Sequence, residues 1–141
     1  MSYPTSYSAD KVAALALGIA AMPGAFTSGE LKEFFADGVY VRCLTLNACE
    51  LIVGKVHLKG HVLIVLGNVE VYSAAGREHI EGLHFEECKP GAQRSFWARE
   101  DSWLITVHPN PDNLRDTEAL ERILVTDNLA LAAQTVEGLL P

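Results

Sequence analysis

The side chains best suited to chemistry in this sequence are histidines placed at the ends of apolar runs. His57 and His61 enclose a short polar step before the apolar run 62–66, and His108 ends the mainly apolar run 103–107. Imidazole can serve as a general base, a proton donor or a metal ligand. This placement predicts a pocket near the strand ends and leaves its chemistry open.

A metal site at the first two histidines depends on the path of the chain between them. Side chains four residues apart on a flat strand share a face but lie about 13 Å apart. One metal ion needs both nitrogens within about 2.1 Å of it. Only a bulge or corner at Lys59-Gly60 would bring His57 and His61 together, and His108 could then add a third ligand. The alternative is that the histidines are hydrogen-bonded residues at the edge of the core.

Cysteine chemistry has less support in the sequence. Cys88 could be a nucleophile with His84 or His108 as its base, but only Lys89 nearby could favour a thiolate. The chain has three cysteines, an odd number without metal-binding spacing, which is typical of reduced thiols in a cytosolic protein.

Length and composition indicate a single domain. The chain has 141 residues, of which 49% are hydrophobic, enough to build a core without disulfide or metal cross-links. Its net charge of −7 argues against a nucleic-acid polymer or an anionic membrane as general partner. The apolar stretch 12–22 is too short to span a bilayer and lacks the basic region of an export signal. We therefore expect a cytoplasmic protein.

Short strands and turns in the middle of the chain predict an antiparallel sandwich or barrel. Apolar or alternating runs occur at 39–46, 51–56, 62–66, 69–72 and 103–108. Turn signals occur at Asn47-Ala48, Lys59-Gly60, Gly67-Asn68 and Ala75-Gly76. No helix of useful length fits between these runs, so a parallel α/β sheet is disfavoured.

Helices are predicted on both sides of the strands. The first spans about residues 9–23, and a capping box at Thr27–Glu30 predicts a second one that ends at Asp37-Gly38. Two more are expected over Thr117–Val125 and from Asp127 onward. The chain thus divides into an N-terminal helical segment 1–38, a β-barrel 39–109 and a C-terminal helical segment 110–141, all within one compact domain.

Three central motifs carry a resemblance to a known family. They are a Gly-x-x-His-x-x-x-His step at Gly54–His61, a Pro-Gly-x-x-Arg turn at Pro90–Arg94, and an acidic, tryptophan-containing strand at Asp101–His108. With these motifs the chain resembles the cupin superfamily of RmlC-like jelly rolls, and most closely small cupin-like proteins encoded by bacteriophages. The resemblance implies a mainly β fold with flanking α-helices: a cupin-like antiparallel β-barrel or jelly roll with N-terminal and C-terminal helices.

The metal ligands of this family are only partly present. By the resemblance, His57 and His61 occupy two of the four ligand positions, whereas Lys55 and Arg94 occupy the other two. A guanidinium or a protonated amine does not ligate a metal at neutral pH. We therefore favour no cofactor. The alternative is a divalent transition metal (Zn, Fe, Ni or Mn) on His57, His61 and His108.

Arg94 gives the pocket a different chemistry. The resemblance places it at the mouth of the barrel, where its fixed fork of donors suits a phosphate or a carboxylate. The alternative is a salt bridge from Arg94 to Asp101 or Glu100. The predicted ligand-binding residues, with the last three as an apolar wall, are His57, His61, Arg94, His108, Trp103, Tyr72 and Phe96.

We interpret the chain as a protein that binds a small anionic ligand, a nucleotide or nucleotide sugar. If phage-encoded, it could sequester a nucleotide signal of host immunity in the host cytoplasm. The alternative is an enzyme of the epimerase, isomerase or dioxygenase type that uses the barrel-mouth histidines, with or without a metal; no catalytic residue is assigned. The resemblance also implies a homodimer or a higher homo-oligomer, because cupins commonly pair through their sheets.

Overall fold

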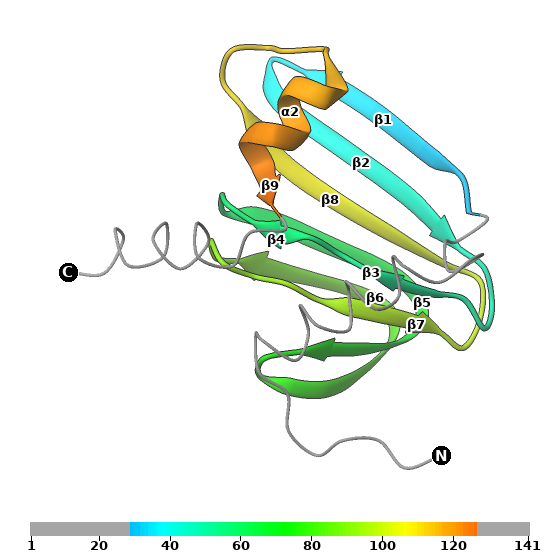
Figure 1. Cartoon of the computed structure of the whole chain (residues 1–141). Coiled ribbons are helices and arrows are strands. Elements are labelled where there is room, and N and C mark those ends of the chain that lie inside the picture. Colours follow the sequence, from blue (N-terminus) through cyan, green and yellow to red (C-terminus); the bar gives the residue numbers. More distant parts are fainter. Residues whose placement is uncertain (1–28, 127–141) are drawn as a thin grey trace.

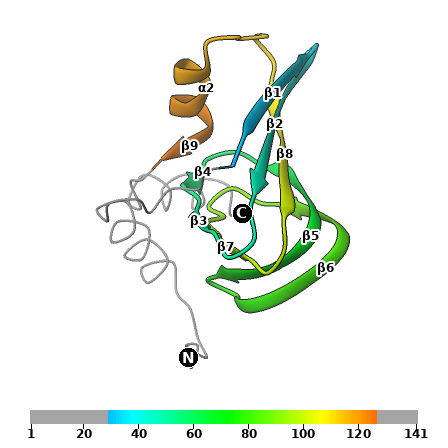
Figure 2. The same ribbon diagram turned by 90° about the vertical axis from the view of Figure 1, so that its right-hand side faces the viewer.

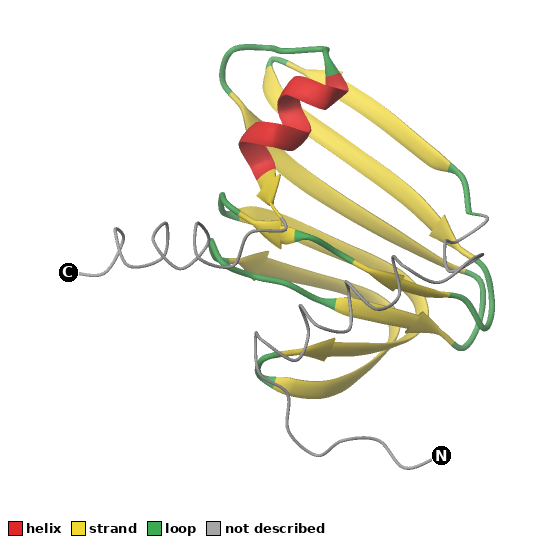
Figure 3. Ribbon diagram, viewed as in Figure 1, coloured by secondary structure: helices red, strands yellow, loops and turns green. Residues whose placement is uncertain are grey.

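The computed structural model describes residues 29–126, which form a curled antiparallel sheet, a half-barrel, with one helix at its end (Figures 1 and 3). The elements are β1 (Leu31–Ala36), β2 (Gly38–Leu46), β3 (Leu51–Val53), β4 (Val56–His57), β5 (His61–Ser73), β6 (Gly76–Cys88), β7 (Ser95–Ala98), β8 (Ser102–Asn110), α2 (Thr117–Leu124) and β9 (Val125–Thr126). The predicted helix at Thr117–Val125 is confirmed. The expected helices at 9–23 and from Asp127 onward lie outside the described residues.

The sheet is organised around β5. Its first half, Val62–Leu66, pairs with β8, and its second half, Val69–Tyr72, pairs with β7. β6 follows β5 along its whole length on the other side. Because β5 changes partner midway, the sheet bends over on itself, and Figure 2 shows this curl in the β5–β6 hairpin.

Two facing glycines form the bend in this hairpin. Gly67 and Gly82 are direct partners, and both have positive φ, 148° and 86°. A Cβ on Gly67 would also overlap the Ser102 hydroxyl, to which the Asn68 N–H donates at 3.0 Å. The predicted turn at Gly67-Asn68 is therefore wrong. Strand β5 continues through these residues, and Gly67 lets the strand bend without ending.

The hydrophobic core lies inside the curl. Its buried residues come from β2, β5, β6, β7 and β8 and include Leu46, Leu63, Val65, Val69, Val71, Ile80, Phe96, Ala98 and Leu104. Beyond the corner, the buried carboxylate of Glu70 accepts hydrogen bonds from Arg77 Nε at 3.0 Å and Arg99 Nε at 2.8 Å. These bonds satisfy a charge that burial alone would make unfavourable.

Helix α2 closes one end of the inner face. Asp116 caps it by accepting from the Glu118 N–H at 3.1 Å, and its buried Leu120 and Leu124 pack on Tyr40 of β2. β9 then pairs with β4, and the Leu58 N–H donates to the Leu124 carbonyl at 2.8 Å. The helix therefore fixes the short strand that carries His57.

The predicted helix over 27–37 is wrong where the structure describes it, because Leu31–Ala36 is strand β1. β1 forms a hairpin with β2, with Phe34 opposite Val41 and Phe35 opposite Tyr40. The turn between them places Gly38 at φ 75°. Strand structure thus extends into the segment assigned as helical. None of the described helical residues forms a stretch long and apolar enough to cross a membrane.

We expect Gly67→Ala to destabilise the fold by about 2–4 kcal/mol, because it combines backbone strain with an overlap on Ser102. Urea unfolding followed by circular dichroism measures this change. Gly82→Ala is the matched control, since Gly82 shares the positive φ but a Cβ at this position would have no atom within 4 Å. Equal losses in the two variants would contradict the overlap.

Candidate functional site

A corner in the chain brings the first two histidines together. β4 ends at His57, β5 begins at His61, and the chain turns between them at 58–60. The ring centroids of His57 and His61 are 3.9 Å apart, far closer than a flat strand would allow. The corner that the sequence required at Lys59-Gly60 is therefore present.

The Pro90–Arg94 turn holds this corner in place. The His57 N–H donates to the Ala92 carbonyl at 2.9 Å, and the Gly91 N–H donates to the His57 carbonyl at 2.7 Å. The Gly54 N–H donates to the Arg94 carbonyl at 2.9 Å. Two motifs that are far apart in the sequence are thus fixed side by side by backbone hydrogen bonds.

His108 of β8 completes a cluster of three imidazoles. Its ring centroid lies 5.5 Å from that of His57 and 5.4 Å from that of His61. Thr106 Oγ1 lies 2.9 Å from His108 Nε2, and the Tyr40 ring stacks on the other side at 5.9 Å. His61 and His108 are buried, so the cluster lies on the inner face of the sheet.

Burial keeps these imidazoles neutral. It lowers the pKa of His57 to about 3, with further lowering by the neighbouring His61, His108 and the arginines. Burial, followed by the charges of His61 and Arg42, lowers the pKa of His108 to about 4. The pKa of His61 is lowered mainly by burial too, although its contact with the Lys59 carbonyl opposes the shift. At neutral pH each ring therefore offers one N–H donor and one bare nitrogen.

Two guanidinium groups flank the cluster. Arg42 of β2 is the direct partner of Thr106 in the sheet, and its charge acts on His57 and His108. Arg94 acts on His57 and His61. Arg42 Nε and His57 Nδ1 are buried and have no hydrogen-bond partner in the described part of the chain.

The partners of Arg94 differ from those that the sequence suggested. Its Nη2 lies 3.2 Å from Glu86 Oε1 and its Nη1 lies 2.8 Å from Cys88 Sγ. The alternative salt bridge to Asp101 or Glu100 is wrong, because β6, not the 99–102 turn, runs beside Arg94. Asp101 instead accepts from the Ala48 N–H at 2.9 Å.

The predicted aromatic wall is not assembled at the histidines. On β8, Trp103 and His108 are five positions apart, an odd offset, so the strand turns Trp103 to the opposite face, where it is 38% exposed. Phe96 belongs to the hydrophobic core. Tyr72 is buried at the far end of β5 from His61.

Sequence reasoning missed Arg42, Thr106 and Glu86. All three are on the inner face, since Arg42 pairs with Thr106, Thr106 with Leu63, and Leu63 with Glu86. Arg42 carried a detectable signal, because a charged residue interrupts an otherwise apolar run from Val39 to Leu46. Glu86 carried no such signal, because both faces of β6 contain polar as well as apolar residues.

The three histidines fit a single metal ion only in part. A tetrahedral ion at about 2.1 Å from each nitrogen would place ring centroids roughly 5 Å apart. Two separations are close to this, but His57 and His61 stack with planes 22° apart, so their nitrogens lie side by side rather than converging. No group of three or more histidine, cysteine or carboxylate side chains in residues 29–126 is arranged to hold a metal. We therefore derive no chemistry through a metal, and the ligand set His57, His61 and His108 stays a prediction.

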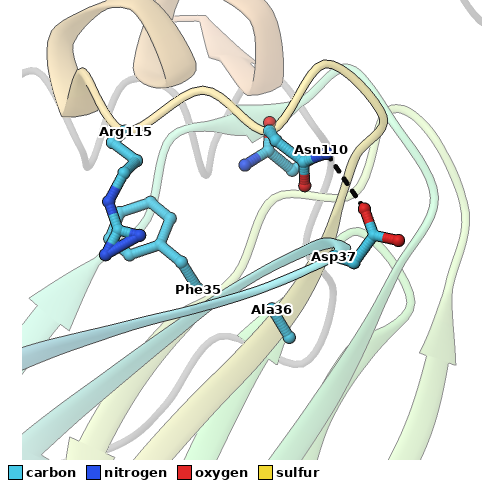
Figure 4. A pocket seen from close by; sticks show the side chains of 6 residues that line it. Phe35, Ala36, Asp37, Asn110 and Arg115 are labelled. Atoms are coloured by element: carbon cyan, nitrogen blue, oxygen red, sulfur yellow. Dashed lines mark hydrogen bonds between the residues drawn. The ribbon is translucent and has the colours of Figure 1, made fainter.

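A separate cavity of about 280 Å³ lies at the β1–β2 turn (Figure 4). Its lining includes Phe35, Asp37, Asn113 and Arg115. Asn113 donates to Asp37 at 3.0 Å and accepts from the Gly38 N–H at 2.8 Å, while Arg115 lies over the Phe35 ring. Because these amides already bond to the protein, we regard the cavity as a feature of the turn and the histidine cluster as the candidate site.

Comparison with solved structures supports the fold. No protein-family model matches the sequence, and no curated protein matches it. Ectoine synthase from P. lautus aligns with a TM-score of 0.52 and 16% identity, over 72% of this chain and 76% of that chain. KdgF from Halomonas sp. aligns with a TM-score of 0.51 and 16% identity, over 70% of this chain and 88% of that one.

A cupin 2 conserved barrel domain protein from Salinispora arenicola CNS-205 also aligns, with a TM-score of 0.51 and 10% identity, over 72% of this chain and 92% of that chain. The fold of the described residues is therefore that of a cupin-type jelly roll, which confirms the predicted mainly β fold, while of the predicted flanking helices only the one at Thr117–Leu124 lies within the described residues. At these identities the likeness shows the fold alone. The narrower likeness to bacteriophage proteins remains a prediction.

We expect stability to fall as the pH drops from about 6.5 towards 4. Unfolded histidine binds a proton near its ordinary pKa, whereas His57 and His108 do so only near 3 and 4, so in this window the unfolded chain binds more protons. Urea unfolding at stepped pH measures the slope. His57→Asn should make it shallower, and His79→Asn, at an exposed strand position, should not. A flat profile between these pH values would show that the histidines are not buried neutral.

Proposed function

We propose that this protein binds a small anionic ligand on the inner face of the half-barrel, at the cluster of His57, His61, His108, Arg42 and Arg94. The observation that carries the proposal is the convergence of these five nitrogen-bearing side chains on one site. They come from four strands and the Pro90–Arg94 turn.

The balance of charge favours an anion. Two guanidinium groups act on the cluster, whereas Glu86 is the carboxylate in contact with one of them, Arg94. A bound cation would lie close to both arginines and be repelled by them. A phosphate or carboxylate would be attracted, more strongly than in water because the site is partly buried.

The available donors have the right chemistry as well. Arg42 Nε is a buried N–H without a partner in the described residues, and such a group is unfavourable unless an acceptor meets it. Neutral imidazoles can add N–H donors without adding charge repulsion between them. A ligand oxygen placed near Arg42 and His57 would satisfy both.

A nucleotide or a nucleotide sugar is the ligand class that we propose, because its phosphate suits the guanidinium groups. Sequestration of an immune nucleotide by a phage-encoded protein rests on the family resemblance. The apolar wall that the sequence predicted for the ligand pocket cannot include Trp103, which lies on the other face of the sheet.

An enzyme is the second candidate, favoured by the three neutral imidazoles. A buried neutral histidine can accept a proton from a bound substrate, as a general base does. The solved structures with this fold include an ectoine synthase and a salicylate 1,2-dioxygenase, so the fold supports catalysis in other chains. No residue here is assigned a catalytic role.

Titration calorimetry with inorganic phosphate, adenosine monophosphate and a uridine diphosphate sugar tests the binding proposal. Arg42→Gln should weaken binding of the preferred anion by about 10- to 100-fold, since a hydrogen bond to a charged group contributes about 1.5–3 kcal/mol. Arg94→Gln should weaken it as well.

Arg122→Gln is the matched control, because Arg122 is an exposed arginine in the last turn of α2. Binding of no anion, or equal binding by Arg42→Gln and the wild type, would contradict the proposal.

Elemental analysis of untreated protein distinguishes a metal-dependent enzyme from a site that works without a metal. The arrangement of the rings leads us to expect less than one equivalent of zinc, iron, nickel or manganese per chain. A full equivalent that is lost in His61→Ala would instead establish a metal centre at the cluster.

A further inference from the structure

Among the described residues, three full charges act on the histidine cluster. The charges of Arg42 and Arg94 are positive, and that of Glu86 is negative. Two of them belong together, because Arg94 Nη2 lies 3.2 Å from Glu86 Oε1, within ion-pair distance. Arg42 forms no ion pair in this part of the chain, and its buried Nε has no hydrogen-bond partner there. The cluster therefore carries a surplus of one positive charge.

Other charged side chains near the cluster leave this surplus unchanged. Glu33 of β1 is the direct strand partner of Arg42, but the two side chains form no ion pair, and the charge of Glu33 acts on Tyr40. Lys55, which precedes β4, is paired with Glu121 of α2 at 3.0 Å. Neither of these two charges acts on the three imidazole rings.

The surplus charge and the ion pair belong to opposite ends of the site. One row of direct strand partners crosses β2, β8, β5 and β6, and its members are Arg42, Thr106, Leu63 and Glu86. At about 4.8 Å per strand, the backbones of Arg42 and Glu86 lie roughly 14 Å apart. The two histidines on the middle strands, β8 and β5, lie between these ends in the neighbouring row.

A surplus of one positive charge matches a single negative charge on the ligand. A phosphodiester or a carboxylate carries one negative charge, which Arg42 balances. A phosphate monoester carries nearly two at about pH 8, because its second pKa is about 6. The second charge finds no counter-charge in the site, since Glu86 already neutralises Arg94. Moving an unbalanced charge out of water into a partly buried site is unfavourable.

We propose that the site selects a ligand whose anionic group is singly charged, a phosphodiester or a carboxylate, and that Glu86 sets this selectivity. The selectivity rests on the binding function proposed above and narrows its ligand class to monoanions. Arg42 and the neutral histidines receive the charged group. The Arg94–Glu86 pair offers both donors and acceptors to uncharged polar groups at the other end of the ligand, such as hydroxyls.

Titration calorimetry at about pH 8 with adenosine monophosphate and its phosphate methyl ester tests the selectivity. The two ligands share base and sugar, and the methyl group removes one charge from the phosphate. The wild-type protein should bind the methyl ester at least about ten-fold more tightly than the monophosphate. Glu86→Gln raises the surplus to two positive charges, so it should abolish or reverse this preference.

Glu87→Gln is the matched control. It changes the net charge of the chain by the same amount, but Glu87 follows Glu86 on β6 and therefore lies on the opposite face of the sheet. The preference should stay as in the wild type. The double variant Glu86→Gln with Arg94→Gln lacks both members of the ion pair and has a surplus of one again. Its preference for the methyl ester should return, although both affinities fall. Circular dichroism melts check that each variant folds.

The possible results separate the selectivity from the binding function. Tighter binding of the methyl ester that is lost in Glu86→Gln and returns in the double variant supports the selectivity. Equal or tighter binding of the monophosphate by the wild type overturns the selectivity and leaves the binding function standing. A preference that is unchanged in Glu86→Gln removes Glu86 as its cause. Binding of neither ligand, by the wild type and by Glu86→Gln, contradicts the binding function itself.

Discussion

The arrangement of this protein depends on the backbone hydrogen bonds between Gly54–His57 and the Pro90–Arg94 turn. They bend the chain between β4 and β5, and without that bend His57 and His61 would lie on one strand, too far apart to share a site. The same bonds fix the turn from which Arg94 extends. β9 and α2 support the corner from the other side, through the Leu58–Leu124 bond and the packing of Leu124 near Tyr40. Side-chain chemistry at this site is therefore set by backbone pairing between distant motifs.

Burial decides which chemistry the corner can support. Imidazoles placed this close cannot all be charged, and removal from water lowers the pKa of His57 to about 3. Neutral rings are competent both as metal ligands and as hydrogen-bond donors, so their protonation state does not choose between these roles. The choice comes from the neighbours. Arg42 and Arg94 keep their charge at any physiological pH, repel a cation and attract an anion. The stacked geometry of His57 and His61 adds to this preference, because parallel rings do not direct their nitrogens to one point.

The sequence predicted the fold well where local patterns and pairing agree. The alternation in 39–46 matches β2, the jelly-roll motifs match β4–β8, and the helix at Thr117 begins after a capping aspartate. The prediction failed where the local sequence pattern favoured one structure and pairing with a neighbouring strand favoured another. Leu31, Phe34 and Phe35 have helical spacing, but the hairpin partner β2 draws them into a strand, and the Thr45 N–H already donates to the Glu30 carbonyl at 2.9 Å. Gly67 looked like a turn, although a glycine opposite another glycine can bend a strand without ending it.

The site was less predictable than the fold for a geometric reason. Its residues are close because strands that are distant in the sequence pair in one register, and a register cannot be derived from any single strand. Arg42 faces the histidines only because β2 pairs with β8 so that Arg42 meets Thr106; a shift by one residue would send it outward with Val41 and Cys43. The same shift on β8 would exchange Trp103 and Ile105 for Leu104 and Thr106. A single register therefore sets both faces at once: the site and the hydrophobic core on the inside, and the exposed apolar side chains on the outside. The pairing of β2, β8 and β5 is thus the constraint that any variant of either face has to preserve.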